Sequence, residues 1–173
     1  MVVTSIRKAS LRVSAAGNYA WSARLGELHV ALFAFLLNLP WEFLQIPLYA
    51  GMPVMPHWEA VQACIQAALG DVLITLMAYW SVAVWHRRHD WLRGYGAKEC
   101  VGFVLVGVGI TVAMEWHATL FSQRWEYAQL MPRVPWLGTG LSPLLQWLIL
   151  PPLMLWMARR HRLGSEVVSK ENN

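Results

Sequence analysis

Charge is what this sequence has least of. Only 14% of its 173 residues are Asp, Glu, Lys or Arg, whereas 57% are hydrophobic. Soluble domains carry charge on about a quarter of their residues and gather their apolar residues into periodic faces. A water-soluble globule is therefore not expected, and the composition is typical of an integral membrane protein.

Cysteine and recognisable catalytic motifs are also scarce. The two cysteines, Cys64 and Cys100, belong to no paired metal-binding motif. We expect them near opposite faces of the bilayer, so a disulfide between them is not predicted. The sequence contains no His-Glu-x-x-His zinc motif, no nucleophile elbow and no phosphate-binding loop. We therefore predict no metal site, assign no cofactor, and leave open whether the chain is an enzyme.

The apolar residues gather into four long blocks. About 20 residues of helix cross the hydrocarbon core of a bilayer, so each block is long enough to span it. The blocks cover residues 28–50, 60–85, 100–121 and 141–158. The last block is shorter than about 20 residues unless residues 136–140 extend its helix. The predicted fold is all-α, a polytopic bundle of four transmembrane helices over residues 27–158.

The basic residues predict the orientation of this bundle. Only Arg124 and Arg133 lie in the connections after the first and third blocks. The others precede the first block, separate the second from the third, or follow the fourth: Arg7, Lys8, Arg12, Arg24, Arg87, Arg88, Arg93, Lys98, Arg159, Arg160, Arg162 and Lys170. The positive-inside rule then places both termini in the cytoplasm, as a basic segment over residues 1–26 and a basic tail over 159–173. Since no basic stretch carries interleaved aromatics or a reader motif, nucleic acid is not an expected partner.

Three carboxylates interrupt the otherwise uncharged spans: Glu42, Asp71 and Glu115. A carboxyl group near the bilayer centre costs about 2.5 to 3.5 kcal/mol on insertion scales, so the bundle interior must offset that cost. Helical rise places Glu42 and Glu115 at similar depth and Asp71 nearer the midplane. We expect Glu42 and Glu115 to be neighbours in one cavity, sharing a proton or a cation, with Asp71 at its floor. These three are the candidate catalytic residues.

Further polar side chains recur at helical spacing from these carboxylates, and two tryptophans, Trp41 and Trp116, adjoin Glu42 and Glu115. We expect six of them to bind a ligand in the same cavity: Asn38, Trp41, Gln45, Thr111, Trp116 and Gln146. Such amides and hydroxyls more often serve as hydrogen-bonding contacts between transmembrane helices. Packing contacts do not require charge, however, so a functional role is favoured for the carboxylates.

The connection over residues 122–140 is long and mixes aromatic with charged residues. Arg124, Trp125 and Tyr127 lie at its start and are expected at the mouth of the cavity, as further ligand-binding residues. Aromatic rings with polar edges settle at the headgroup level, so the loop is expected to lie along the outer interface, either as an aromatic anchor, which is favoured, or as a lid over the cavity.

Several phrases resemble a family of small, uncharacterised bacterial four-span integral membrane proteins. They are LPWEFLQIPLY from Leu39, Gly70-Asp71-Val72, Glu115-Trp116, RWEY from Arg124, Met131-Pro132 and GTGLSPLLQW from Gly138. The resemblance covers residues 28–155 and implies four spans in the bacterial inner (cytoplasmic) membrane. It implies no activity, so no catalytic role is carried over from it.

Three functions fit these features. The first is an outward-opening pocket that binds or converts a lipid-like or isoprenoid molecule, with the carboxylates as acid, base or carbocation stabilisers. The second is binding or transport of a small cation or proton by the same carboxylates. The third is a noncatalytic accessory subunit that binds another membrane protein. The first is favoured, because the inner halves of the first and third spans are almost wholly apolar and offer no visible through-path.

Overall fold

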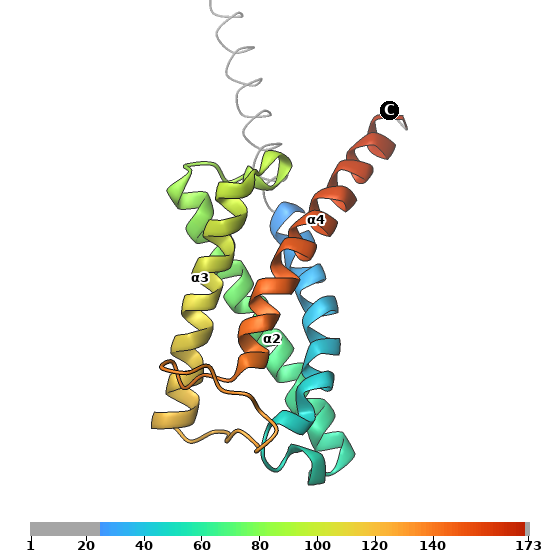
Figure 1. The fold of residues 1–173 in the computed structure, drawn as a ribbon. Coiled ribbons are helices and arrows are strands. Elements are labelled where there is room, and N and C mark those ends of the chain that lie inside the picture. The colour runs from blue at the N-terminus through green and yellow to red at the C-terminus, as the bar shows by residue number, and fades with distance from the viewer. Residues whose placement is uncertain (1–24, 172–173) are drawn as a thin grey trace, which may run out of the picture.

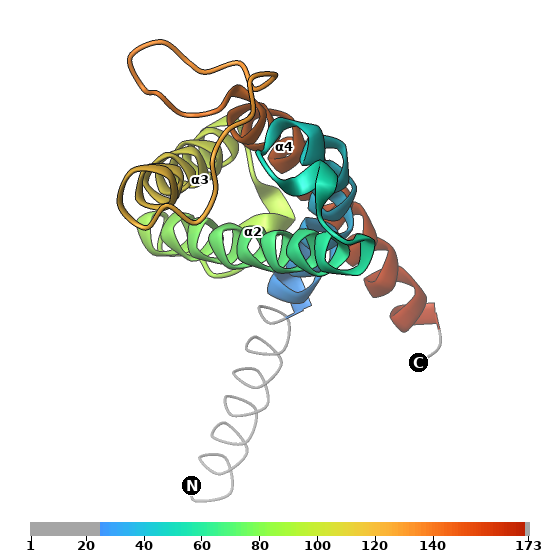
Figure 2. The same cartoon turned by 90° about the horizontal axis from the view of Figure 1, so that it is seen from below.

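The computed structural model describes residues 25–171, with side chains to residue 165, and is built from four long helices. They are a first span over Leu25–Leu48, α2 over His57–Trp85, α3 over Ala97–Trp116 and α4 over Leu141–Glu171 (Figure 1). Viewed along its axis, the bundle arranges them in a ring in the order first span, α2, α3, α4 (Figure 2). The predicted all-α four-helix bundle is confirmed. The expected N-terminal segment lies almost wholly outside the described residues.

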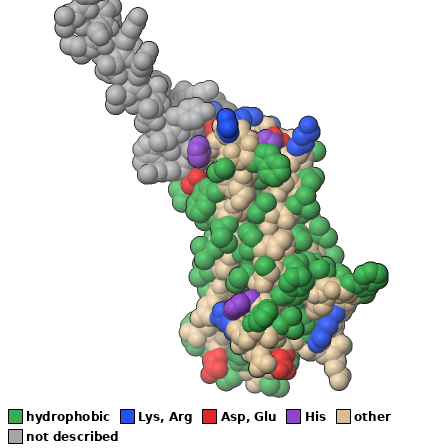
Figure 3. Space-filling model, turned by 90° about the vertical axis from the view of Figure 1, so that its left-hand side faces the viewer, with side chains coloured by type: hydrophobic (Ala, Val, Ile, Leu, Met, Phe, Trp, Pro, Cys, Tyr) green, Lys and Arg blue, Asp and Glu red, His purple; other side chains and the backbone are tan. Residues whose placement is uncertain are grey.

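Each of the four helices is long and apolar enough to cross a membrane. Mean hydropathy is 1.4 for Leu25–Leu48, 1.7 for His57–Trp85, 1.7 for Ala97–Phe121 and 1.4 for Leu141–Ser165. Large apolar side chains point outward on every helix, among them Leu44, Leu73, Leu105 and Leu148. In the space-filling view, Lys and Arg gather toward the two ends and hydrophobic side chains occupy the length between them (Figure 3). This is the surface of a multi-pass membrane protein, whose apolar side chains face lipid.

The fourth helix differs from its predicted extent. It begins at Leu141, so residues 136–140 do not lengthen it. Its length comes instead from the other end, because the helix continues through the expected tail to Glu171. Two prolines, Pro151 and Pro152, lie inside it. Pro47, by contrast, sits in the short 3-10 turn η1 (Ile46–Leu48) that closes the first span.

One end of the bundle, here called the terminal end, holds both ends of the described chain (Figure 1). A short 3-10 turn, η3 (Trp91–Gly94), folds into it from the connection between α2 and α3. The Trp91 side chain is 1% exposed, and its Nε1 donates to the Tyr79 carbonyl at 3.2 Å. The hydroxyl of Tyr79 donates in turn to the carbonyl of His89 at 3.1 Å. The turn and its neighbours form an apolar core that fills this half of the bundle.

An ion pair fastens α4 to the same turn. Arg162 is only 2% exposed, and its guanidinium bonds to the carboxylate of Asp90. Asp90 also accepts from Arg93 at 3.3 Å. The sequence placed Arg162 in a basic tail, whereas the structure buries it, because the continuing helix brings it against the η3 connection.

Helices α3 and α4 pack closely at Gly107. A Cβ built on Gly107 would lie 1.7 Å from a ring carbon of Trp147, which is itself 3% exposed. No side chain larger than hydrogen fits there. Gly109, two residues along α3, meets nothing within 4 Å of its Cβ position.

Gly107→Ala is expected to lower the free energy of unfolding by about 1 to 3 kcal/mol, because the added methyl group overlaps Trp147. Thermal unfolding in detergent measures the change. Gly109→Ala is the control and should not lower stability, since its added methyl group enters open space. Equal loss in both variants would contradict the close packing of Trp147 on α3.

A polar cavity at the loop end of the bundle

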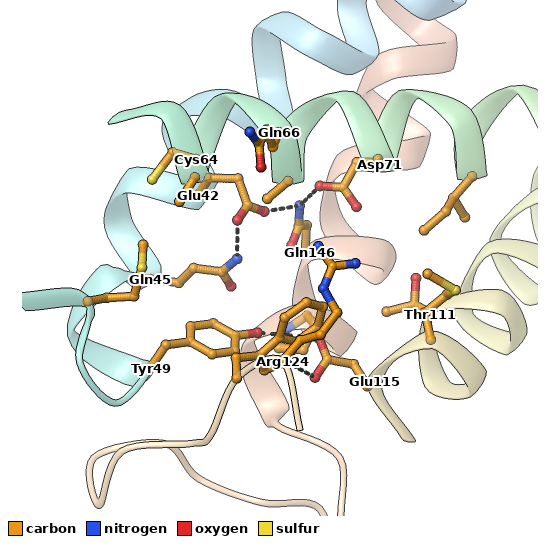
Figure 4. Close-up of a pocket in the computed structure, with 18 of the residues that line it drawn as sticks. Glu42, Gln45, Tyr49, Cys64, Gln66, Asp71, Thr111, Glu115, Arg124 and Gln146 are labelled. Atoms are coloured by element: carbon orange, nitrogen blue, oxygen red, sulfur yellow. Dashed lines mark hydrogen bonds between the residues drawn. The ribbon is translucent and has the colours of Figure 1, made fainter. Parts of the chain in front are cut away.

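The opposite end, here called the loop end, contains a cavity of about 420 Å³ between the helices (Figure 4). All four helices contribute to its wall, and so does the connection that follows α3. Its polar and aromatic lining consists of Glu42, Gln45, Tyr49, Cys64, Gln66, Asp71, Thr111, Glu115, Arg124, Trp125 and Gln146. The three carboxylates predicted to converge therefore do share one chamber.

The side-chain amide of Gln146 joins three helices inside this cavity. Its Nε2 lies 2.8 Å from Asn38 Oδ1, 2.8 Å from Asp71 Oδ2 and 3.2 Å from Glu42 Oε1. An amide nitrogen carries two hydrogens, so it serves two of these three acceptors at a time. Gln146 thus connects α4 with both the first span and α2 through a single group.

Glu42 receives a second donor from its own helix. Gln45 Nε2 donates to Glu42 Oε2 at 2.8 Å, and Ser142 of α4 donates to Gln45 Oε1 at 2.9 Å. The spacing of three residues along the first span puts Glu42 and Gln45 on one face of the helix. Gln45, Ser142 and Gln146 therefore form a network of neutral side chains around this carboxylate.

Glu42 and Asp71 form the close carboxylate pair, and they flank Gln146 (Figure 4). The two carboxyl groups lie within hydrogen-bonding reach of each other. Among the described residues, neither forms an ion pair. Carboxyl groups this close share a proton or bind a cation between them. The expectation that Glu42 would pair with Glu115 is corrected, because Gln146 enters from α4 and draws Asp71 to Glu42.

Glu115 occupies a separate position, next to the loop. Its oxygens accept from Tyr49 at 3.4 Å, from Trp125 Nε1 at 3.3 Å and from the hydroxyl of Tyr127. Burial and the neighbouring Glu115 carboxylate raise the pKa of both Tyr49 and Tyr127. Both phenols therefore remain protonated donors at physiological pH.

The two connections at this end are bonded to each other across the mouth of the cavity. Ala50 N donates to Glu126 O at 2.8 Å and Ala128 N donates to Leu48 O at 2.9 Å, on either side of an antiparallel bridge between Tyr49 and Tyr127. Trp116 fastens the far part of the loop, because its Nε1 donates to Leu137 O at 2.6 Å. The loop over residues 122–140 is thus held against the bundle by backbone and side-chain bonds.

The structure sorts the twelve residues predicted for the site into three groups. Eight line the cavity: Glu42, Gln45, Asp71, Thr111, Glu115, Arg124, Trp125 and Gln146. Asn38 and Tyr127 lie behind the lining and bond to it. Trp41 and Trp116 do not line it: the buried Nε1 of Trp41 has no partner within the described chain, and Trp116 bonds to the loop. Adjacency in sequence misplaced these two, since neighbours on a helix point about 100° apart.

Sequence reasoning missed Tyr49 as a site residue, although its spacing carried the signal. Glu42, Gln45 and Tyr49 follow one another at steps of three and four, which is the spacing of one helical face. Cys64 and Gln66, on α2, were also not assigned to the site and line its wall. Nothing in its immediate sequence separates Cys64 from other residues of an apolar span, whereas Gln66 is a polar residue four positions after Gln62.

The cavity has no arrangement typical of a metal centre. Within residues 25–171, no three or more His, Cys, Asp or Glu side chains are grouped so that they hold a metal ion. Comparison of the chain with protein-family models, with curated proteins and with solved structures found no match. The function therefore has to be inferred from the chemistry of the cavity itself.

Gln146→Leu is expected to destabilise the protein by about 1 to 3 kcal/mol, because it leaves buried acceptors on Asn38, Glu42 and Asp71 without their shared donor. Thermal unfolding in detergent is the measurement. Gln62→Leu is the matched control, since Gln62 is an exposed glutamine of α2 outside the cavity lining. Comparable unfolding temperatures for the two variants would show that the Gln146 amide does not hold the helices together.

Tyr127→Phe is expected to loosen the loop over residues 122–140, since it removes one of three donors to Glu115. A hydrogen bond to a charged group contributes about 1.5 to 3 kcal/mol, so amide hydrogen exchange in the loop should accelerate about tenfold or more. Tyr95→Phe, a change at the terminal end, should leave this exchange unaltered. Unchanged loop exchange in Tyr127→Phe would indicate that backbone bonds alone hold the loop.

Proposed function

We propose that this chain is a bacterial inner-membrane protein, with both termini in the cytoplasm, whose cavity binds a lipid-like molecule taken from the bilayer. One observation carries the proposal: the polar cavity is bordered by side chains that face the surrounding lipid. Gln66 and Ala67 of α2 and Met114 of α3 line the cavity and are exposed. An amphipathic molecule would therefore place its head in the polar chamber and its chain in an opening between α2 and α3.

Gly70 marks this opening. It lines the cavity on α2, and a Cβ built on it meets nothing within 4 Å. The antiparallel packing of α2 and α3 places Gly102 beside Val82, so Gly70 falls at the level of Met114. The gap between these two residues is where a hydrocarbon chain would pass from the cavity to the bilayer.

The apolar packing of the terminal end favours ligand binding over transport through the bundle. A cluster of buried apolar residues, including Phe103, Met154 and Trp91, fills the terminal end. The turn η3 packs its Trp91 and Leu92 into the same core. A cation or proton entering at the loop end therefore meets an apolar barrier, which favours a site with one entrance.

The close pair of Glu42 and Asp71 also supports conversion of the bound molecule. Two carboxyl groups that meet at the amide of Gln146 can share one proton between them. Such a pair is suited to general acid–base chemistry on a head group placed beside it. Binding is the prior step, and it can be tested without knowing a reaction.

Gly70→Phe is expected to close the opening and to abolish cross-linking of the cavity by a phospholipid that carries a photoreactive group on its acyl chain. The purified protein is incorporated into vesicles with this probe, irradiated, and the cross-linked residues are mapped by mass spectrometry. In the wild-type chain, cross-links are expected on α2 and α3 around Gly70 and Met114.

Gly109→Phe is the matched control. Gly109 also has open space at its Cβ position and lies on α3 outside the lining, so the same added ring should leave cavity labelling intact. Labelling spread evenly along the outer surfaces of all four helices, and equal in both variants, would refute a lipid site in the cavity.

A further inference from the structure

The cavity contains charges of both signs that do not neutralise each other. Glu42, Asp71 and Glu115 form no ion pair with any described residue, and neither does Arg124. The side chain of Arg124 nevertheless extends from the loop into the cavity (Figure 4). Its guanidinium lies 5.8 Å from the centre of the Trp125 ring, the one aromatic contact recorded for it in the described chain. Glu42 and Glu115 are buried, and a buried carboxylate without a counter-charge is costly, whereas Arg124 is exposed at the cavity wall. This separation points to a ligand that supplies both counter-charges.

Thr111 provides an independent indication of a ligand. It lines the cavity from α3, is 6% exposed, and its buried Oγ1 has no hydrogen-bond partner within the described chain. Helical threonines ordinarily donate to the carbonyl four residues earlier. Thr119 does so, with Oγ1 2.7 Å from Glu115 O, whereas Thr111 does not. An unused hydroxyl therefore faces the same chamber as the unpaired carboxylates.

We propose, on the basis of the lipid site proposed above, that the ligand is a lipid with a zwitterionic head group bearing a primary ammonium and a phosphate. The ammonium lies against Glu42, Asp71 and Thr111, the phosphate lies at Arg124, and the acyl chains leave between α2 and α3. A primary ammonium has three N–H donors for these oxygen acceptors. A guanidinium presents paired donors that match phosphate oxygens.

The alternative head groups each leave part of the cavity without a partner. A trimethylammonium group has the charge but no N–H donor, so the carboxylates and Thr111 keep unmet hydrogen bonds. A glycerol head group has no positive charge for Glu42 and Asp71. A long-chain amine without phosphate leaves Arg124 unpaired and brings a second cation toward it. The primary ammonium with its phosphate is the combination that serves Glu42, Asp71, Thr111 and Arg124 together.

The test compares the binding of defined lipids to the full chain. Delipidated protein in detergent is mixed with phosphatidylethanolamine, phosphatidylcholine or phosphatidylglycerol, and bound lipid is measured by native mass spectrometry. Phosphatidylethanolamine is expected to bind at least about tenfold more tightly than the other two, the effect of one charge-assisted hydrogen bond. Equal affinity for the three lipids, with cavity cross-linking intact, would overturn the head-group assignment and leave the lipid site standing.

Two variants separate the two halves of the head group. Asp71→Asn should remove the preference for phosphatidylethanolamine over phosphatidylcholine, whereas Arg124→Gln should weaken both about tenfold, because both contain phosphate. Glu59→Gln and Arg160→Gln, at exposed positions outside the cavity, should bind as the wild type does. Glu42→Gln repeats the ammonium test should Asp71→Asn fail to fold. Retention of the lipid preference in both carboxylate variants would refute the ammonium position.

The water-soluble head group gives the last arm of the test. Phosphoethanolamine has the same charges without acyl chains and should compete with the lipid only at far higher concentration. Displacement of the lipid by equimolar phosphoethanolamine would overturn the lipid assignment in favour of a soluble zwitterion. Absence of any bound or cross-linked lipid would instead refute the lipid site itself.

Discussion

A carboxylate within a bilayer needs its hydrogen-bond donors from the protein, because the surrounding acyl chains offer none. In this bundle the amide of Gln146 meets that requirement for Glu42 and Asp71 at once, and so draws the first span, α2 and α4 to one point. The cavity, its close carboxylate pair and the position of the loop beside Glu115 all depend on this placement. Replacing the contact by apolar packing would remove the Gln146 donor from Asp71 and leave Glu42 with Gln45.

The two halves of the bundle divide structural and chemical roles. At the terminal end, the turn η3 inserts Trp91 and Leu92 among apolar side chains, and the bond between Asp90 and Arg162 fastens α4 to that turn. This half is packed and needs no ligand. At the loop end, polar side chains replace apolar ones and leave a chamber of about 420 Å³. A rigid base therefore supports an open site, which keeps the cavity-lining residues in position in the absence of a bound molecule.

Much of the site was accessible from sequence because a helix has a fixed period. The spacing of Glu42 and Gln45, and of Thr111 and Glu115, assigned each pair to one face, and all four line the cavity. Tyr49 belonged to the same series and was overlooked. Trp41 and Trp116 were included because they adjoin a carboxylate, yet adjacent helical residues point in different directions. Helical spacing assigned these residues to the cavity lining correctly, whereas adjacency to a carboxylate did not.

The sequence by itself determined the number of spans and the burial of their polar faces. An apolar run of about twenty residues is long enough to cross the bilayer as a helix, and a charged side chain within such a helix has to face the protein interior. It did not determine which acids meet. Glu42 pairs with Asp71 because Gln146 arrives from α4, 104 residues farther along the chain. The burial of Arg162 likewise depended on Asp90, which lies 72 residues earlier. Contacts between distant segments follow from how helices pack. The spacing of residues along one helix predicts which of them share a face, but it does not predict which other helix that face contacts.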